Sequence, residues 1–188
     1  MVSKGSCKDT IAILAYDRRW PAMYEEERRR LAMAFGSAAV EIHHIGSTSV
    51  PGLSAKPVID MMIAVRDMNN AQGLRTLMRN LGYVYVAVDD EPNRMFFRKG
   101  APRTHHVHIV RFRGAEYRRH LLFRDHLLSN PSVQAEYVVL KKRLAKEFRE
   151  DRSSYVEGKS GFIESVLARA KSSGAAKRRR AASQSARK

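Results

Sequence analysis

A polar loop between two apolar segments is the feature that most constrains how this chain can fold. Apolar residues run over 40–45 and resume over 58–65, and both stretches have the length of buried strands. Residues 46–57 between them contain two glycines, two prolines, three serines and a threonine, and they offer little apolar surface to bury. The pattern predicts a strand, a tight polar loop and a second strand.

The residues of this loop are suited to holding a phosphate group. Gly46 lets the backbone approach a ligand closely, and neighbouring N–H groups together with the hydroxyl of Ser47 can surround an anion. The second strand then brings Asp60 to the same end of the sheet. A phosphate-binding loop followed about a dozen residues later by a carboxylate is an arrangement through which a divalent metal can join a protein to a nucleotide.

The loop resembles that of a known family. Residues 44–60 read HIGSTSVPGLSAKPVID, similar to the segment H-I-G-S-T-x-V-P-G-L-x-A-K-P-x-I-D of the GrpB family. Shorter similarities follow in the family's order at residues 16–21, 105–110 and 122–131. The resemblance implies a nucleotidyltransferase-like fold over most of the chain, although one fold hosts many activities.

One position departs from the wider nucleotidyltransferase pattern. Those enzymes carry two carboxylates two residues apart on this strand, so that both face the metal ions. Here the strand reads Asp60-Met61-Met62, and a thioether is a poor ligand for a hard cation such as magnesium. Two-metal transfer in its usual form therefore lacks one ligand.

A run of histidines offers substitute ligands. Residues 105–110 read HHVHIV, a strand in which His106 and His108 share one face. Imidazole suits transition metals better than magnesium, so Asp60, His106 and His108 are the candidates for both a divalent metal centre and catalysis. Histidine pairs on sheets also serve as hydrogen-bonded structural groups or as phosphate-binding groups, and these alternatives stay open.

Further ligand-binding candidates surround this centre. His44 directly precedes the loop, Lys56 stands between the loop and Asp60, and Arg103 leads into the histidine run. Each has a structural alternative, namely a buried histidine or a solvated cation, and a serine of the loop can instead cap a turn. The predicted ligand-binding set is His44, Gly46, Ser47, Ser49, Lys56 and Arg103.

The order of predicted elements indicates an α+β fold. Helical spacing of apolar residues marks the segments 21–35, 71–81, 116–128, 133–148 and 153–170. Strand patterns mark the segments 40–45, 58–65, 83–88, 95–98 and 105–112. Because strands crowd the first half, we expect a small mixed sheet covered by helices on one face, followed by a helical C-terminal half.

The formal net charge of +16 is partly a property of the C-terminus. Residues 171–188 hold seven basic residues and no acid, and subtracting these from +16 leaves +9 for residues 1–170. Their remaining composition is Ser, Ala, Gly and Gln, so we expect one domain over 1–170 and a disordered tail over 171–188. The basic run 177–180 is typical of a solubilising tail, a nucleic-acid arm or a nuclear-import signal.

Two function classes fit these features. The first is a metal-dependent enzyme that binds a nucleoside triphosphate such as ATP and transfers a nucleotidyl or phosphoryl group. The second is a module that binds a nucleotide or another small anion without turnover, which Met62 favours. A metal enzyme of different chemistry at Asp60 and the histidines lies between them.

The sequence also indicates where the chain works. No apolar run is long enough to span a bilayer, and Cys7 is the sole cysteine, so neither a membrane span nor a disulfide framework is predicted. We expect a cytoplasmic location, or a nuclear one where 177–180 acts as an import signal. The sequence patterns do not specify the oligomeric state.

Overall fold

The computed structural model describes residues 10–87 and 94–185, and their side chains as far as residue 173. Its centre is a five-stranded sheet in the order β1-β2-β5-β4-β3. The strands are β1 (Ala39–Ile45), β2 (Ile59–Val65), β3 (Val84–Val86), β4 (Arg94–Lys99) and β5 (His105–Arg111). Strands β2 and β5 run parallel and the other neighbouring pairs are antiparallel, which confirms the predicted mixed sheet. The predicted strand 83–88 extends to residue 88, which lies outside the described residues.

Six α-helices accompany the sheet in the described ranges. They are α1 (Trp20–Phe35), α2 (Ala71–Asn80), α3 (Ala115–Ser129), α4 (Pro131–Glu147), α5 (Arg152–Glu157) and α6 (Ser160–Ser185). Prolines lie in the first turns of α1 and α4, where their missing N–H groups leave no hydrogen bond unmade. Asn70 and Asp151 cap α2 and α5 by accepting backbone N–H bonds.

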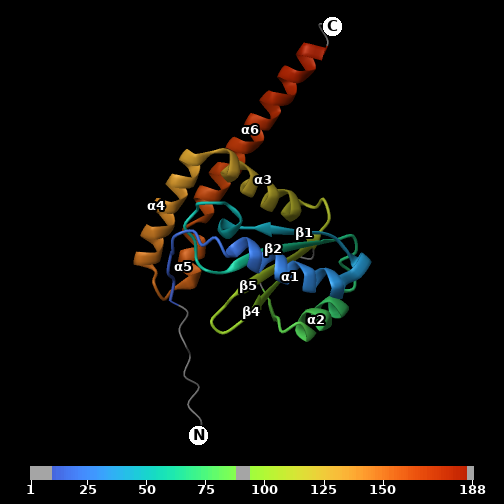
Figure 1. Cartoon of the computed structure of the whole chain (residues 1–188). Helices are drawn as coiled ribbons and strands as arrows, with labels where there is room; N and C mark the ends of the chain where they lie inside the picture. Colours follow the sequence, from blue (N-terminus) through green and yellow to red (C-terminus); the bar gives the residue numbers. More distant parts are fainter. Residues whose placement is uncertain (1–9, 88–93, 186–188) are drawn as a thin grey trace.

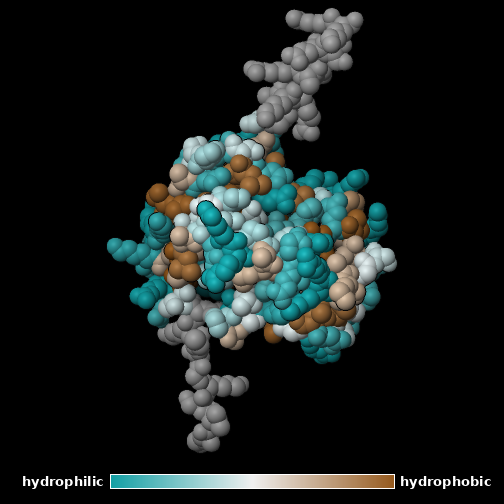
Figure 2. Space-filling view, in the orientation of Figure 1, coloured by the Kyte–Doolittle hydropathy of each residue, from teal (hydrophilic) through white to brown (hydrophobic). Residues whose placement is uncertain are grey.

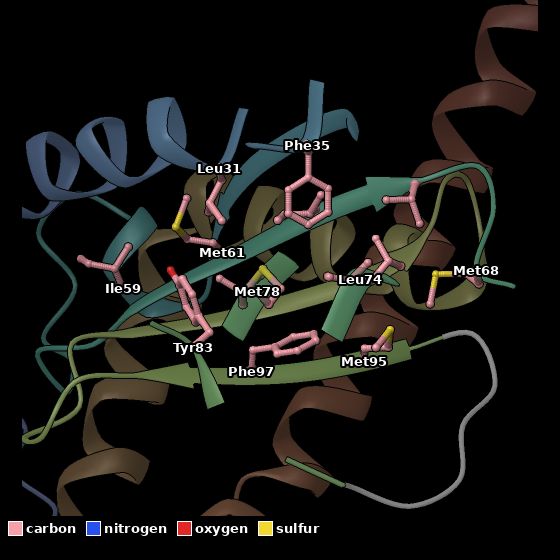
Figure 3. Close-up of a cluster of buried hydrophobic side chains, with 14 of the residues drawn as sticks. Leu31, Phe35, Ile59, Met61, Met68, Leu74, Met78, Tyr83, Met95 and Phe97 are labelled. Carbon is pink, nitrogen blue, oxygen red and sulfur yellow. The ribbon is translucent and has the colours of Figure 1, made fainter. Parts of the chain in front are cut away.

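One face of the sheet packs against α1 and α2 (Figures 1 and 3). Figure 3 shows Leu31 and Phe35 of α1 and Leu74 and Met78 of α2 pointing toward Met61 and its neighbours on the strands. Burying each such side chain stabilises the fold by about 1.5–3 kcal/mol. This layer is the main apolar core.

The expectation that helices cover only one face is wrong. Helix α3 lies on the opposite face, where Tyr117 and Leu121 pack against buried Ile45, Met62 and Val110. The reason is that the central strands β2 and β5 carry apolar residues at both odd and even positions. Leaving either face in water would therefore expose core side chains.

A buried ion pair joins α1 to the edge of the sheet. Glu27 is 3% exposed and accepts hydrogen bonds from Lys99 Nζ at 2.7 Å and from the Tyr83 hydroxyl at 2.9 Å. Burial alone would raise the pKa of Glu27, but the bonds from Lys99 and Tyr83 outweigh burial and hold this pKa below its usual value. Glu27 is therefore a stabilising carboxylate of the fold.

The C-terminal region differs from its prediction. The expected helix 153–170 is divided at Gly158, where a Cβ would lie 2.7 Å from Leu144 Cδ2 of α4, so the glycine permits this close packing. Helix α6 continues to Ser185, so residues 171–185 are helical rather than disordered, and it extends beyond the body of the fold at the top of Figure 1. Their lack of an apolar face motivated the prediction of disorder, but alanine and arginine are strong helix formers.

The surface seen in Figure 2 is mostly hydrophilic, and its apolar patches are scattered. Exposed large apolar side chains include Met33, Val84 and Val139, which belong to three different elements. In residues 10–87 and 94–185, no helix combines the length and apolarity that crossing a membrane requires.

Candidate functional site

A cavity of about 770 Å³ lies on the α3 side of the sheet, between the strands and the C-terminal helices. Its walls come from the loop after β1, from β2, β4 and β5, and from helices α3 to α6. Most of the predicted site residues line it, namely Gly46, Ser47, Lys56, Asp60, Arg103, His106 and His108. The structure thus brings together residues from both halves of the chain.

Asp60 and His106 form a hydrogen-bonded pair in the cavity wall. They are direct partners across the parallel β2–β5 pairing, and His106 Nδ1 lies 2.9 Å from Asp60 Oδ1. A neutral ring that donates its Nδ1–H to the carboxylate keeps its lone pair on Nε2, and Arg152 Nη2 lies 3.4 Å from that nitrogen. His106 therefore has one nitrogen fixed by Asp60 and the other directed toward Arg152.

Asp60 is ionised. Burial would raise the pKa of its carboxyl, but the hydrogen bond from His106 and the nearby Lys56 ammonium act in the opposite direction. Together they hold the pKa of Asp60 well below its usual value. The carboxylate is thus available to orient His106 across the neutral pH range.

Three lysines give the cavity its positive end. They are Lys56 in the loop after β1, Lys141 on α4 and Lys159 between α5 and α6. Lys141 is 2% exposed, and its Nζ donates a hydrogen bond to Ser47 Oγ at 3.0 Å. The ammonium groups of Lys56 and Lys159 lie 4.9 Å and 4.6 Å from the centre of the Tyr155 ring. Cation–π contact thus partly replaces the water that these charges lose.

Basic residues outnumber acidic ones in the described lining of the cavity. Eight Lys and Arg residues belong to this lining with the two carboxylates Asp60 and Glu157, and Arg119 pairs with Glu164 outside it. Burial, together with neighbouring charges that include Lys159, lowers the pKa of both Lys56 and Lys141 to about 7. Cations held together in this way destabilise the free protein and favour a bound anion.

The predicted metal centre is not assembled. Across the described ranges, no three His, Cys, Asp or Glu residues are grouped so that they could hold a metal ion. Asp60 Oδ1 is engaged by His106, while the ring of His108 packs 4.8 Å from that of Phe96. Met62, at the place of a second carboxylate, is fully buried under α3. The donors present do not fit a centre shared by Asp60, His106 and His108, and metal binding stays a prediction.

Two predicted ligand residues do not reach the cavity. His44 faces α1, where its ring stacks on Tyr24 with centroids 4.7 Å apart, and burial lowers its pKa to about 4. Strand alternation explains this, because Ile45 points to the α3 face and its neighbour must point away. Ser49 donates its hydroxyl to the Gly46 carbonyl at 2.6 Å, so it closes the turn.

The sequence predictions missed the helical wall of the site. Its members are Tyr137, Lys141, Arg152, Tyr155 and Lys159. A signal for Lys141 existed, because Tyr137, Lys141 and Leu144 follow the spacing of one helix face, and all three are buried. A lysine on an apolar stripe is unusual, since lysine is rarely fully buried unless it is paired.

Known proteins match both the fold and the loop. The family model described as GrpB protein matches residues 10–169. The chain belongs to the GrpB family. UPF0157 protein YqkA of Bacillus subtilis (strain 168) is 39% identical over 165 residues, or 87% of this chain, and the chain spans about half (48%) of that relative's length. The crystal structure of conserved protein GrpB from Enterococcus faecalis matches with a TM-score of 0.78 and 35% identity, covering 85% of this chain and 96% of that one.

A more distant match concerns the fold alone. The Cid1 poly (U) polymerase, in a crystal structure described as Mg 3'-dATP bound, has a TM-score of 0.51 at 14% identity. The match covers 78% of this chain and 49% of that one. The GrpB family fold is therefore nucleotidyltransferase-like and of the α+β class, as the resemblance implied.

Proposed function

We propose that the cavity binds a phosphate-bearing ligand, such as a nucleotide. The observation that carries the proposal is the cluster of three cavity-lining lysines, Lys56, Lys141 and Lys159, in which burial and the closeness of the charges lower the pKa of Lys56 and Lys141. A nucleotide supplies several negative charges on a body small enough for a cavity of about 770 Å³. Its phosphate oxygens would complete hydrogen bonds that the buried lysines cannot make among themselves.

The loop and the helices would hold the phosphates from two sides. Ser47 already accepts a hydrogen bond from Lys141, so the two groups lie side by side. An incoming phosphate oxygen can accept hydrogen bonds from both the Lys141 ammonium and the Ser47 hydroxyl. Lys56 and Lys159 add two point charges beside the Tyr155 ring. Ligand binding of this kind needs residues of α4 as much as those of the motif.

Titration calorimetry with ATP and with inorganic tripolyphosphate tests this function. Lys141→Met removes a buried cation that donates to Ser47, and we expect affinity for both ligands to fall roughly 10- to 100-fold. Lys142→Met is the matched control, because it removes the same charge from the exposed neighbouring position on α4. Failure of the parent protein to bind either ligand, or an equal loss in both variants, would contradict the proposal.

The Asp60–His106 pair favours a second candidate function, the transfer of a nucleotidyl or phosphoryl group. With Asp60 fixing Nδ1, His106 Nε2 is placed as a general base. It would take the proton of an acceptor hydroxyl while that oxygen attacks a phosphorus atom and the leaving phosphate carries away the electron pair of the broken P–O bond. We include in this proposal a divalent metal as cofactor. We also include nucleic acid as a candidate acceptor.

Phosphorus NMR of ATP incubated with the protein separates transfer from binding. Turnover in the parent that disappears in His106→Asn, with ATP affinity preserved, would establish the enzyme. Samples with magnesium, manganese or zinc test the metal prediction in the same experiment. Intact ATP in every sample, with binding confirmed by calorimetry, would leave the binding module as the function.

A further inference from the structure

The cavity face of the sheet is organised in rows of side chains across three strands. The first row consists of Asp60, His106 and Arg98, which are direct partners across β2, β5 and β4. The second consists of Met62, His108 and Phe96, one two-residue step further along the strands. Such a step is about 7 Å, so the two rows can contact different parts of one ligand.

The second row is aromatic. The ring of His108 lies 4.8 Å from that of Phe96, and His120 of α3 completes the group with its ring 4.9 Å from His108. Burial lowers the pKa of His108 well below its usual value and that of His120 to about 4, and the charge of Arg94 acts in the same direction. Both rings are therefore neutral at pH 7, and this end of the cavity differs from the lysine end.

Nitrogen atoms of this group lack hydrogen bonds. His108 Nδ1, His120 Nε2 and Arg94 Nε are buried without a hydrogen-bond partner in the described part of the chain, although Glu116 Oε2 lies 3.7 Å from the His120 nitrogen. An unmade hydrogen bond at a buried polar atom costs roughly 1–3 kcal/mol. Because the χ2 torsion of histidine is broad and two-fold, each imidazole can turn to present its nitrogen to the cavity. The free protein thus holds unused hydrogen-bonding capacity beside flat rings.

We propose that the second row is a nucleobase subsite. A planar heteroaromatic ring would stack against His108 and Phe96, and its polar edge would bond to His120 and Arg94. The phosphates of the same ligand would lie at the lysine end, so this inference rests on the proposed function and names its ligand class as a nucleotide.

The test compares ligands with and without a base. Calorimetry on the full chain would use tripolyphosphate, ATP, GTP, CTP and UTP as probes. We expect at least one nucleoside triphosphate to bind about tenfold or more tightly than tripolyphosphate. In His120→Phe, which keeps a ring but removes its nitrogens, that ratio should fall to within roughly threefold, with tripolyphosphate affinity unchanged.

Two further variants keep the outcome clear. Phe96→Leu removes a ring of the same row, so it should also reduce the ratio even if His120→Phe fails to fold. His105→Phe is the matched control, because His105 Nε2 is likewise buried and unpartnered among the described residues but lies outside the cavity lining. If tripolyphosphate binds as tightly as every nucleotide, the nucleobase subsite is wrong but the proposed function still stands. The same conclusion follows if His120→Phe and Phe96→Leu both keep the parent's ratio of nucleotide to tripolyphosphate affinity. If the parent protein binds neither tripolyphosphate nor any nucleotide, both the nucleobase subsite and the proposed phosphate-binding function are wrong.

Discussion

Gly46 lies directly against Asp60, so that a Cβ on this glycine would come within 2.5 Å of Asp60 Oδ2. The glycine also has a φ of +68°, which other residues rarely adopt. Ile45 and Asp60 are partners across β1 and β2, so the chain must turn immediately above the carboxylate. The first glycine of the motif is therefore required by its neighbouring strand before any ligand is considered.

Gly46→Ala should combine backbone strain with this collision. We expect the free energy of unfolding to fall by roughly 2–4 kcal/mol, and the His106 ring signals in NMR spectra to shift as Asp60 moves. Gly36→Ala is the control, because Gly36 has a φ of +51° but no atom of the described residues lies within 4 Å of the position that a Cβ would take. Its cost should be limited to about 1–2 kcal/mol of strain. Equal losses in the two variants would show that Asp60 is not crowded.

Lys141→Met should stabilise the free protein while it weakens ligand binding. The buried ammonium has a pKa of about 7 in the folded chain and its ordinary, higher pKa when unfolded, so the unfolded state binds more protons between these values. The parent should gain stability as pH rises above 7, with a slope roughly 1.4 kcal/mol per pH unit steeper than that of the variant. Urea denaturation at pH 6 and pH 9 measures this difference. A variant less stable than the parent at pH 6 would contradict it.

Affinity for phosphate ligands should fall as pH rises from 6 to 8. Lys56 and Lys141 both have pKa values of about 7, so they are cationic at pH 6 and increasingly neutral at pH 8. Binding near pH 7.5 should then take up protons, which calorimetry detects as a dependence of the binding enthalpy on the buffer. If affinity does not change with pH and the binding enthalpy does not change with the buffer, Lys56 and Lys141 do not contact the ligand.

Glu27→Gln should destabilise the join between α1 and the sheet. The change removes the charge that pairs with Lys99 and weakens the bond from Tyr83, at a cost of roughly 2–4 kcal/mol by thermal or urea denaturation. Because folding lowers the pKa of Glu27, its stabilisation is present above the unfolded value and is lost as pH falls. Glu26→Gln, on the exposed side of the same helix, should change stability by less than about 0.5 kcal/mol.

Deleting residues 171–188 should leave the domain intact. Ala170 is buried, but residues 171–173 are exposed, so α6 can end there without opening the core. We expect a melting temperature within about 2 °C of the parent and unchanged ATP affinity. Loss of seven positive charges should weaken binding to RNA or DNA at low salt. A markedly lower melting temperature would mean that the helical extension supports the fold.

Local sequence patterns were enough to predict the sheet and the cavity wall that the strands and the loop after β1 form. Alternation and chain-breaking residues define β1, β2 and β5, and the spacing of two residues places His106 and His108 on one face. The loop residues Gly46 and Ser47 follow from the same pattern. These features depend on neighbours in the sequence, which is why they could be read directly.

The cavity wall formed by the C-terminal helices depends on tertiary packing that no local sequence pattern specifies. Lys141 meets Ser47 from 94 positions later in the chain, and the docking of α4 decides that contact. His44 was misplaced because alternation shows that two adjacent residues face opposite ways but not which way faces the ligand. The metal prediction relied on shared strand face alone; the hydrogen bond between Asp60 and His106 engages Oδ1 and Nδ1, and metal binding stays a prediction.

The cavity walls come from the sheet and from the C-terminal helices together, so a bound ligand would bridge two segments that lie far apart in the sequence. Ligand binding would then stabilise helices α4, α5 and α6 against local unfolding. Amide hydrogen exchange would slow most in these helices, although the family's sequence motif lies entirely outside them. The region that reports occupancy is therefore remote in sequence from the loop of residues 46–57.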